Sequence, residues 1–266
     1  MGKIVAFANQ KGGVGKTTTC INIAAYLAAM GKKVLVVDMD PQGNATSGLG
    51  IEKTEDVKTL YDAIDGESSV EDVVRTTLVK GLDIIPATVD LAGSEIELVQ
   101  MDSREKVVKN ILNNLRNSYD YIMIDCPPSL GLLTVNALTA SDSVAIPIQC
   151  EFFALEGLSQ LMNTIKLVRK HLNPNIDVEG VILTMKDSRS NLVAQVSQEI
   201  RRFFGQKVYE TAIPRNIRLA EAPSHGEPIM IYDARSKGAV AYLELTEEFL
   251  KRNKDSYKKI TKYTKI

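Results

Sequence analysis

The sequence contains no apolar run of about 18 residues or more, the length that a transmembrane helix needs. Residues 1–10 lead directly into a strand pattern, so we expect them to form the first strand and not a signal peptide. The three cysteines, Cys20, Cys126 and Cys150, form neither a C-x-x-C pair nor a metal-binding spacing. These absences argue against a membrane-spanning protein or a disulfide scaffold, and they suit reduced thiols in the cytoplasm.

Histidine is scarce too, with only His171 and His225, which lie far apart and have no ligand partner spaced nearby. No Ser/His/Asp or Cys/His arrangement is evident, so we expect no covalent catalysis. The chain shows no internal repeat, low-complexity segment or linker. We therefore expect a single domain over residues 1–252 and a basic C-terminal tail over 253–266 that frays.

The net charge of −1 is unevenly distributed. Residues 189–266 carry 15 lysines and arginines against nine aspartates and glutamates, a net charge of +6, and the rest of the chain is correspondingly acidic. A basic C-terminal third suggests an anionic partner such as nucleic acid or a membrane surface. On charge alone, a solvated surface with a charged tail explains the excess equally well.

Short apolar runs alternate with amphipathic stretches along the whole chain. Alternation of this kind predicts a doubly wound α/β fold, with a mostly parallel sheet flanked by helices. The region 50–80 is more polar and is expected to add helices and loops beside the sheet. The expected strands cover residues 4–8, 33–38, 82–86, 121–125, 143–148, 180–184 and 207–211, and the expected helices cover about 20–31, 104–116, 153–170, 191–204 and 237–252.

The first strand leads into a glycine-rich turn and then a helical pattern, the layout of a phosphate-binding loop. Glycines allow backbone N–H groups to converge on an anion, and the start of a helix adds partial positive charge. Lys16 can reach the β- and γ-phosphates, and the Thr17 hydroxyl can bind Mg²⁺. The predicted nucleotide-binding residues here are Lys11, Gly12, Gly13, Val14, Gly15, Lys16, Thr17 and Thr18.

The loop departs from the usual pattern G-x-x-x-x-G-K-[ST], because Gln10 stands where the first glycine is expected. An extra lysine, Lys11, opens the loop instead. With Lys16 five residues later, two cations are directed at one small loop, and they would repel each other without an anion between them. The form KGGVGKT is the deviant Walker A motif.

Acidic residues follow two of the expected strands. Asp38 and Asp40 close the second strand, and Asp125 ends the strand YIMID, which looks like a Walker B strand. Ligands of open α/β sheets bind beyond the carboxyl ends of the strands, so these acids are expected near the phosphate loop. There they suit magnesium and water chemistry, and Asp125 can bind Mg²⁺ directly or through water. A loop-capping role for Asp38 remains open.

The segment 214–224, PRNIRLAEAPS, is a third block of interest. Without further information it is a surface loop with an ion pair between Arg218 and Glu221, which would contribute little stability. Arg189 lies between a strand and a helix, and any single exposed arginine is more often merely solvated.

These motifs together resemble the deviant Walker A ATPases of the ParA/MinD superfamily, and most closely the chromosomal ParA proteins of the Soj type. The resemblance rests on the phosphate loop and on DMDPQGNATSGLG, IDCPPSLG and IPRNIRLAEAPSHGEPI, which together span most of the chain. It implies a Mg²⁺-dependent ATPase, slow without its partner, that forms face-to-face dimers on binding ATP. It also implies dimers that bind DNA without sequence preference until a ParB-like centromere-binding protein stimulates hydrolysis, with a cytoplasmic, nucleoid-associated location.

The resemblance also assigns roles to individual residues. It implies that Lys11 reaches the phosphates of the partner subunit and that Lys16 acts within its own site. Asp40 would support the attacking water, and Asp38 would help to hold the water shell of the metal, with Thr17 and Asp125 as further metal-site residues. Pro214 and Asn216 would contact adenine. Arg189 and Arg218 match positions of DNA-contacting arginines, and Arg201, Arg202, Arg235 and Lys237 are further candidates.

Three alternatives remain open. A MinD-like membrane ATPase would use the C-terminal tail as an amphipathic helix, but the apolar face of Tyr257, Ile260, Tyr263 and Ile266 is narrow, so no stable membrane association is expected. A nitrogenase-reductase-like protein would hold an iron–sulfur cluster on cysteines such as Cys126 and Cys150. A scaffold that binds nucleotide without hydrolysis would not need Asp40 and Asp125.

Overall fold

The computed structural model describes residues 1–151, 153–187 and 189–260. Within them a seven-stranded sheet has the order β3-β4-β2-β5-β1-β6-β7. All neighbouring strands run parallel except the edge strand β3, which is antiparallel to β4. The strands are β1 (Lys3–Phe7), β2 (Val34–Asp38), β3 (Arg75–Thr76), β4 (Leu82–Ile85), β5 (Tyr121–Asp125), β6 (Ser143–Gln149) and β7 (Asp177–Thr184).

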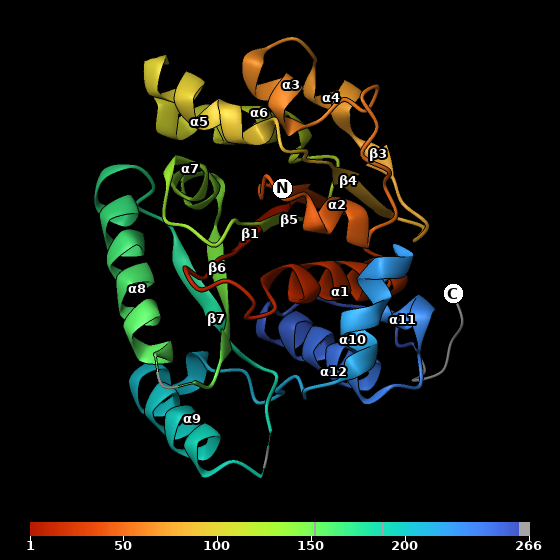
Figure 1. Ribbon diagram of the computed structural model, residues 1–266, viewed down its shortest axis with the longest axis vertical. Helices are drawn as coiled ribbons and strands as arrows, with labels where there is room; N and C mark the ends of the chain where they lie inside the picture. Colours follow the sequence, from red (N-terminus) through yellow and green to blue (C-terminus); the bar gives the residue numbers. More distant parts are fainter. Residues whose placement is uncertain (152, 188, 261–266) are drawn as a thin grey trace.

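Helices cover both faces of this sheet, so the predicted doubly wound, mostly parallel fold is confirmed. Figure 1 shows α1 and α12 on one side, with α7 and α8 on the other. The helices are α1 (Lys16–Ala29), α2 (Asn44–Gly48), α3 (Leu60–Asp65), α4 (Val70–Val73), α5 (Leu91–Gln100), α6 (Val107–Leu115), α7 (Leu132–Ala140), α8 (Ala154–His171), α9 (Asn191–Phe204), α10 (Ile217–Glu221), α11 (Ile229–Tyr232) and α12 (Lys237–Arg252), with 3₁₀ turns η1 (Arg104–Lys106), η2 (Gly205–Lys207) and η3 (Ala222–His225).

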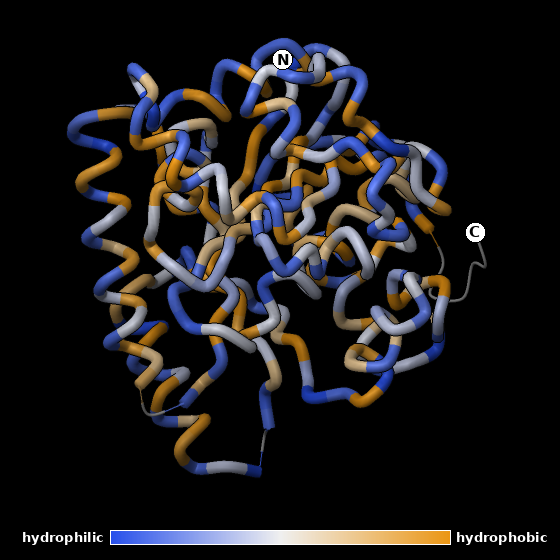
Figure 2. The backbone as a smooth tube through the Cα atoms, turned by 45° about the horizontal axis from the view of Figure 1, so that its top comes forward, coloured by the Kyte–Doolittle hydropathy of each residue, from blue (hydrophilic) through white to orange (hydrophobic). Residues whose placement is uncertain are grey.

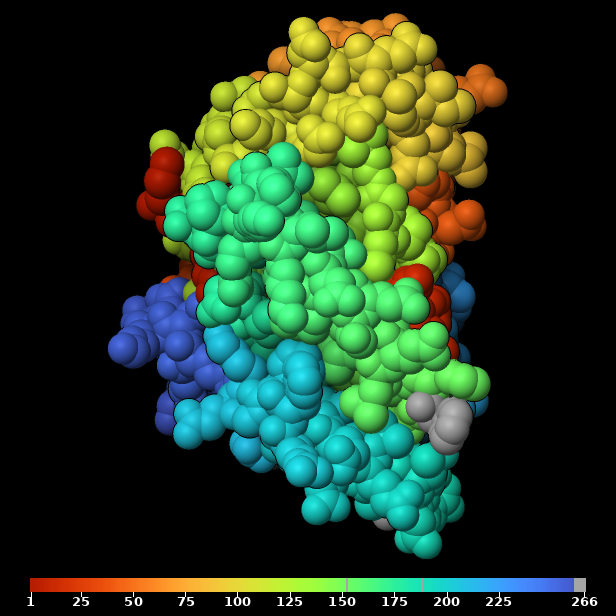
Figure 3. Space-filling view, turned by 90° about the vertical axis from the view of Figure 1, so that its left-hand side faces the viewer, coloured from red at the N-terminus to blue at the C-terminus, as the bar shows by residue number. Residues whose placement is uncertain are grey.

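The central strands are apolar on both faces because each face meets a layer of helices. Successive side chains of a strand point to opposite faces. In β1, Ile4 and Ala6 pack into the core under α7 and α8, whereas Val5 and Phe7 pack into the core under α1 and α12. Figure 2 shows hydrophobic segments in the central strands and alternating hydrophobic and hydrophilic segments along the outer helix α8, and Figure 3 shows α8 and α9 covering one outer face.

Two helices that the sequence patterns do not reveal, α5 and α7, complete the layers. Helix α7 has the sequence LLTVNALTA, and seven of its nine residues are buried. A helix that is buried almost all round shows no amphipathic period. This explains why the pattern gives no helix signal for α7.

The predicted strand 207–211 is wrong. Val208 forms only an isolated parallel bridge with Val181 of β7, and the backbone N–H of Tyr209 donates to the carbonyl of Val181. A regular ladder would next pair Thr211 with β7, but the N–H groups of Glu210 and Thr211 donate to the Glu248 carboxylate on α12. The side chain of a distant helix therefore takes the hydrogen bonds that a strand would need.

The expectation that the tail frays from residue 253 is wrong for its described part. The Asp255 carboxylate accepts hydrogen bonds from Lys32 and from the Tyr121 hydroxyl, at 2.7 and 2.8 Å. Tyr257 and Ile260 pack against the core under α1 and α12, without forming a helix. Residues 261–266 lie outside the described residues. None of the described helices is long and apolar enough to span a membrane.

Candidate nucleotide site

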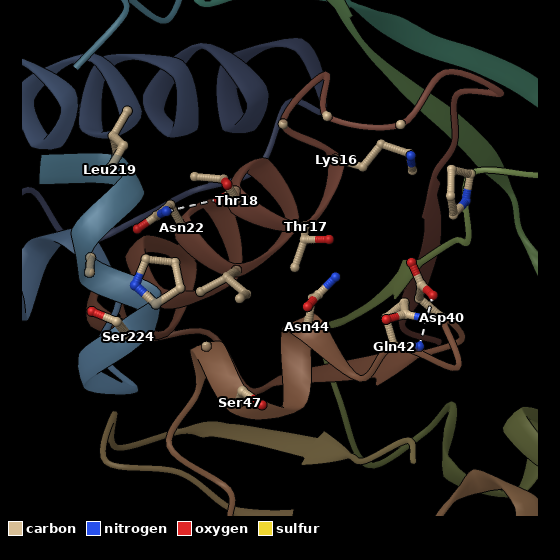
Figure 4. Close-up of a pocket in the computed structure, with 18 of the residues that line it drawn as sticks. Lys16, Thr17, Thr18, Asn22, Asp40, Gln42, Asn44, Ser47, Leu219 and Ser224 are labelled. Atoms are coloured by element: carbon tan, nitrogen blue, oxygen red, sulfur yellow. Dashed lines mark hydrogen bonds between the residues drawn. The ribbon is translucent and has the colours of Figure 1, made fainter. Parts of the chain in front are cut away.

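The phosphate loop, residues 8–15, connects β1 to α1 at the carboxyl edge of the sheet. Gly15 precedes α1 with a φ of 84°, a conformation that other residues adopt only with strain. Gly12, Gly13, Gly15 and the first turn of α1 line a cleft of about 590 Å³, which Figure 4 shows from within. Val14 is buried, and its carbonyl accepts a hydrogen bond of 2.7 Å from the Thr184 hydroxyl, so Val14 anchors the loop to β7.

Lys16 lies in the cleft with its side chain almost fully buried. Its ammonium donates to the carbonyl of Lys11 at 3.2 Å. Burial lowers the pKa of Lys16, although Asp125 acts in the opposite direction. A buried cation with a single weak backbone acceptor is well placed to bind an anionic ligand.

Lys11 forms an ion pair with Glu151, which follows β6, and does not line the cleft that holds Lys16. Its backbone N–H donates to the side chain of Asn9, and Asn9 in turn donates to the carbonyl of Pro147. The two lysines of the loop are thus separated, and the acid that holds Lys11 is 140 positions away in the sequence. No sequence spacing could have identified Glu151.

Asp40 lies on the opposite wall of the cleft, at the start of the loop before α2, with only 6% of its surface exposed. Its carboxylate accepts a hydrogen bond from the N–H of Gln42, and its carbonyl accepts one from Gly43. The N–H of Gln42 donates to only one of the two carboxylate oxygens, so the other oxygen of Asp40 can accept a hydrogen bond from a ligand in the cleft.

Asp38 is fully buried behind Asp40 and does not line the cleft. Its carboxylate accepts hydrogen bonds from the N–H of Asp40 and from the N–H and hydroxyl of Thr46. Burial raises the pKa of Asp38 to about 6, against the lowering effect of the hydrogen bonds from Thr46.

Asp125 ends β5 and differs sharply from Asp38. Both of its carboxylate oxygens are buried and have no partner with full hydrogen-bond geometry among the described residues, although the Thr17 hydroxyl lies near enough to act on the carboxylate. Burial, and then the charge of Asp38, raises the pKa of Asp125, whereas the Thr17 hydroxyl and the Lys16 ammonium lower it. Two buried carboxylate oxygens without such a partner fit a bound cation.

The segment 214–216 lines a second cavity of about 420 Å³ next to the phosphate loop. Pro214 and Asn216 face this cavity together with Gly15 and Thr18, so the structure brings the third sequence block to the first. The Asn216 side-chain oxygen accepts a hydrogen bond from the N–H of Arg218, which orients the amide and leaves its NH₂ group as a donor.

Several lining residues of the cleft were not predicted as site residues from the sequence. They come from α2 and from the turn at η3, and they include Asn44, Ser47, Gly48, Pro223 and Glu227. The two segments meet at Gly50 and Gly226, where a Cβ atom on Gly226 would lie 2.7 Å from the Cα of Gly50. Both segments belong to the motifs DMDPQGNATSGLG and IPRNIRLAEAPSHGEPI. Nothing in their spacing indicates that their polar residues line the same cleft.

Arg189 and Arg218 are exposed and lie on neighbouring segments, since Lys186 forms a parallel bridge with Pro214. Arg189 pairs with Asp187, and Arg218 pairs with Glu221 at 2.8 Å, as the sequence suggested. The carboxylates partly neutralise both cations. Binding of a polyanion there would have to compete with exposed ion pairs, which are individually weak.

Cys126 and Cys150 are buried in the hydrophobic core, and the Cys150 thiol contacts the Ser197 hydroxyl at 3.2 Å. Cys20 is buried as well, and a buried thiol is poorly placed to share an iron–sulfur cluster with a second subunit. Within residues 1–151, 153–187 and 189–260, no group of three or more His, Cys, Asp or Glu side chains could hold a metal by itself.

Comparison with known proteins identifies the family. The family model described as an AAA domain matches residues 2–178. The chain is 61% identical over 248 residues to the sporulation initiation inhibitor protein Soj of Bacillus subtilis, covering 93% of this chain and 98% of Soj. The chain belongs to the ParA/Soj family of partitioning ATPases.

Other members of the ParA/Soj family support this assignment. The chain is 53% identical to the chromosome partitioning protein ParA of Myxococcus xanthus, covering 95% of this chain and 89% of ParA. It is 50% identical to the chromosome-partitioning ATPase Soj of Treponema pallidum, covering 95% and 99%.

Solved structures match the whole fold. A protein named cobyrinic acid a,c-diamide synthase from Mycobacterium smegmatis, crystallised with ADP and magnesium, has a TM-score of 0.84 at 36% identity, with 96% of each chain covered. The cell division ATPase MinD of Pyrococcus furiosus has a TM-score of 0.78 at 27% identity, covering 94% of this chain and 99% of MinD. The fold is thus that of the P-loop ATPases.

Proposed function

We propose that this ParA/Soj family member is a Mg²⁺-dependent ATPase that dimerises on ATP, binds DNA without sequence preference and releases it after hydrolysis. The observation that supports this most directly is the cleft itself. Lys16, Thr17 and Asp40 surround it, and Asp125 presents two unpaired carboxylate oxygens behind it. This combination offers charge for phosphate, ligands for a metal and an acceptor for water.

The residues present fit a magnesium ion. Mg²⁺ prefers oxygen ligands and is usually bound by one or two protein groups together with substrate phosphates and water. The Thr17 hydroxyl and the Asp125 carboxylate would hold it, with Asp38 beside Asp125 adding negative charge. When bound, the metal would neutralise charge on the phosphates.

Asp40 would orient the water that attacks the γ-phosphate, and Lys16 with the loop N–H groups would stabilise the charge on the transferred group. Asp40 has an acceptor free for this water and is held in place by Gln42. The partner-free rate is expected to be slow, because orientation and charge stabilisation are the only contributions that these side chains make.

Lys11 would complete the site of a second subunit. In the described structure it is turned toward Glu151 and does not line its own cleft. Because Lys11 does not line the cleft of its own subunit, its ammonium is available to contact phosphates in the cleft of a second subunit. ATP would then favour the dimer because it binds the dimer better than the monomer.

The base would occupy the cavity beside the loop, with Pro214 against the ring. The free NH₂ group of Asn216 would donate to a ring nitrogen of adenine. The exposed surface around Arg189 and Arg218 would bind DNA phosphates, and the net charge of +6 over residues 189–266 is consistent with this. A ParB-like protein would stimulate hydrolysis, and the protein would be cytoplasmic and associated with the nucleoid.

A sedimentation experiment tests this proposal as a whole. The protein would be mixed with ATP, ADP or no nucleotide, and then with either random-sequence DNA or liposomes containing anionic lipid. We expect dimers by light scattering and cosedimentation with DNA only with ATP. Cosedimentation with liposomes instead would support the MinD-like alternative, and a monomer under all conditions would refute the dimer.

A further inference from the structure

Thr46 is a buried residue of α2 that does not face the nucleotide cleft. Its N–H and its hydroxyl both donate to the same oxygen of Asp38, each at 2.8 Å. The hydroxyl oxygen also accepts a hydrogen bond of 2.9 Å from the N–H of Ala87, which follows β4. The single hydroxyl of Thr46 therefore joins β2, α2 and the loop after β4.

The other oxygen of Asp38 accepts a hydrogen bond of 3.1 Å from the N–H of Asp40. The Asp38 carboxylate is thus bonded to both ends of the segment 40–46, which we call the switch segment. Between these ends, Asp40 is fixed further by the N–H groups of Gln42 and Gly43. This closed set of hydrogen bonds connects Asp40 in the cleft to Asp38 and Thr46.

The switch segment also forms one wall of the cleft. Asp40, Gln42 and Asn44 line it, and Ser47 and Gly48 continue the wall along α2. Thr46 lies on the opposite side of α2, toward Asp38, and touches none of the space that a ligand would fill. Its influence on a reaction would have to pass through Asp38 and Asp40.

We infer that Thr46 is a positioning residue for hydrolysis, which holds Asp40 in place through Asp38. This inference rests on the proposed ATPase function and adds a residue that acts without contacting nucleotide. The phosphate loop, which supplies most of the binding contacts, is anchored separately to β7 through Val14 and Thr184. Removal of the Thr46 hydroxyl should therefore lower the rate of hydrolysis and leave nucleotide affinity nearly unchanged.

Three substitutions separate the hydroxyl from the rest of the side chain. Thr46→Val keeps the shape and removes the hydroxyl, and Thr46→Ser keeps the hydroxyl. Thr46→Ala differs from Thr46→Ser only in the hydroxyl, so this pair gives the same comparison if the valine variant does not fold. Thr139→Val is the matched control, because Thr139 is equally buried and its hydroxyl donates to the carbonyl of Val135 within its own helix, α7.

Steady-state hydrolysis and the affinity for a fluorescent ADP analogue would be measured for each folded variant. We expect kcat to fall about tenfold or more in Thr46→Val and Thr46→Ala, because a small displacement of a water-orienting group is costly. Thr46→Ser and Thr139→Val should keep kcat within about twofold of the parent, and KM and ADP affinity should change less than about threefold throughout.

Equal kcat in Thr46→Ala and Thr46→Ser would overturn the inference, as would a loss confined to KM and ADP affinity. Either result would leave the ATPase proposal standing, provided that the parent protein hydrolyses ATP. Absence of hydrolysis in the parent protein, with and without DNA and partner, would instead refute the proposed function itself.

Discussion

Asp38 and Asp125 are register partners at the ends of β2 and β5, and both carboxyl groups are fully buried. Two neighbouring acids in a dry environment disfavour each other's ionisation. Asp38 offsets this with three hydrogen bonds from the switch segment, whereas Asp125 has none with full geometry among the described residues. The Lys16 ammonium offsets part of this repulsion, and a metal cation bound at Asp125 would offset more of it.

Stabilisation by Mg²⁺ should depend on pH because of this pair. The pKa of Asp38 is raised to about 6, and that of Asp125 is raised as well, so a metal must displace protons as the pH falls through about 6. The Mg²⁺-dependent rise in Tm with ADP should be largest near pH 8 and shrink toward pH 5.5. The effect is up to about 1.4 kcal/mol per pH unit for each proton displaced.

The experiment compares Tm with ADP alone and with ADP plus Mg²⁺ across this pH range. Asp125→Asn should lose most of the Mg²⁺ increment at every pH. An increment that stays constant from pH 5.5 to pH 8 would contradict this assignment of the metal site.

Lys16→Ala should weaken ATP binding by about 100-fold, because the substitution removes a buried cation that makes charge-assisted hydrogen bonds to phosphate. Calorimetric titration with ATP and Mg²⁺ measures this directly. Lys33→Ala is a suitable control, since Lys33 is exposed just before β2, at the opposite edge of the sheet. Retained tight binding by Lys16→Ala would refute the site assignment.

Asp40→Ala should bind ATP and dimerise but hydrolyse at least about tenfold more slowly, because the attacking water loses its acceptor. Phosphate release measures the rate, and light scattering with ATP measures the dimer. Turnover at the parent rate would show that another group orients the water.

Arg189→Ala combined with Arg218→Ala should weaken DNA retention strongly while leaving ATP-dependent dimers intact. For every DNA phosphate that the variant no longer neutralises, the slope of log K against log salt should become shallower by about 0.9. The charge-matched control is Lys33→Ala with Lys80→Ala, two exposed lysines that precede β2 and β4 at the far edge of the sheet. Unchanged DNA retention by the arginine double variant would place the DNA surface elsewhere.

Glu151→Gln should lower the ATP concentration needed for half-maximal dimerisation by about two- to fivefold, since Lys11 must leave its ion pair before it can contact a second subunit. The size is modest because both side chains are 41% exposed, and exposed pairs contribute about 0–1 kcal/mol. Glu156→Gln, an exposed carboxylate in the first turn of α8, is the control. A higher ATP requirement in Glu151→Gln would mean that Glu151 supports the dimer instead.

The sequence predicts the sheet and the phosphate loop well because both are local. Continuous apolar runs such as YIMID and the spacing of Gly12, Gly15 and Lys16 depend on neighbouring residues alone. The structure accordingly confirms most predicted strands, and α9 and α12 at the predicted bounds.

The failures and omissions involve partners that are distant in the chain. The expected strand at 207–211 loses its hydrogen bonds to Glu248, which lies on α12. The same limit applies to the ion pair of Lys11 with Glu151 and to the hydrogen bond of Thr46 with Ala87. Single-sequence patterns carry no information on such pairs, because nothing in the spacing marks which side chains will meet.

The close approach of Gly50 to Gly226 has a practical consequence for engineering nucleotide preference. Both residues have positive φ, and any side chain on Gly226 would collide with the backbone of Gly50. A side chain at either position would push α2 and the η3 turn apart. This would widen the cleft without changing any of its polar groups. Variant libraries that aim to admit bulkier nucleotide analogues should therefore sample these two glycines last, because any space gained there would come from a distorted cleft wall.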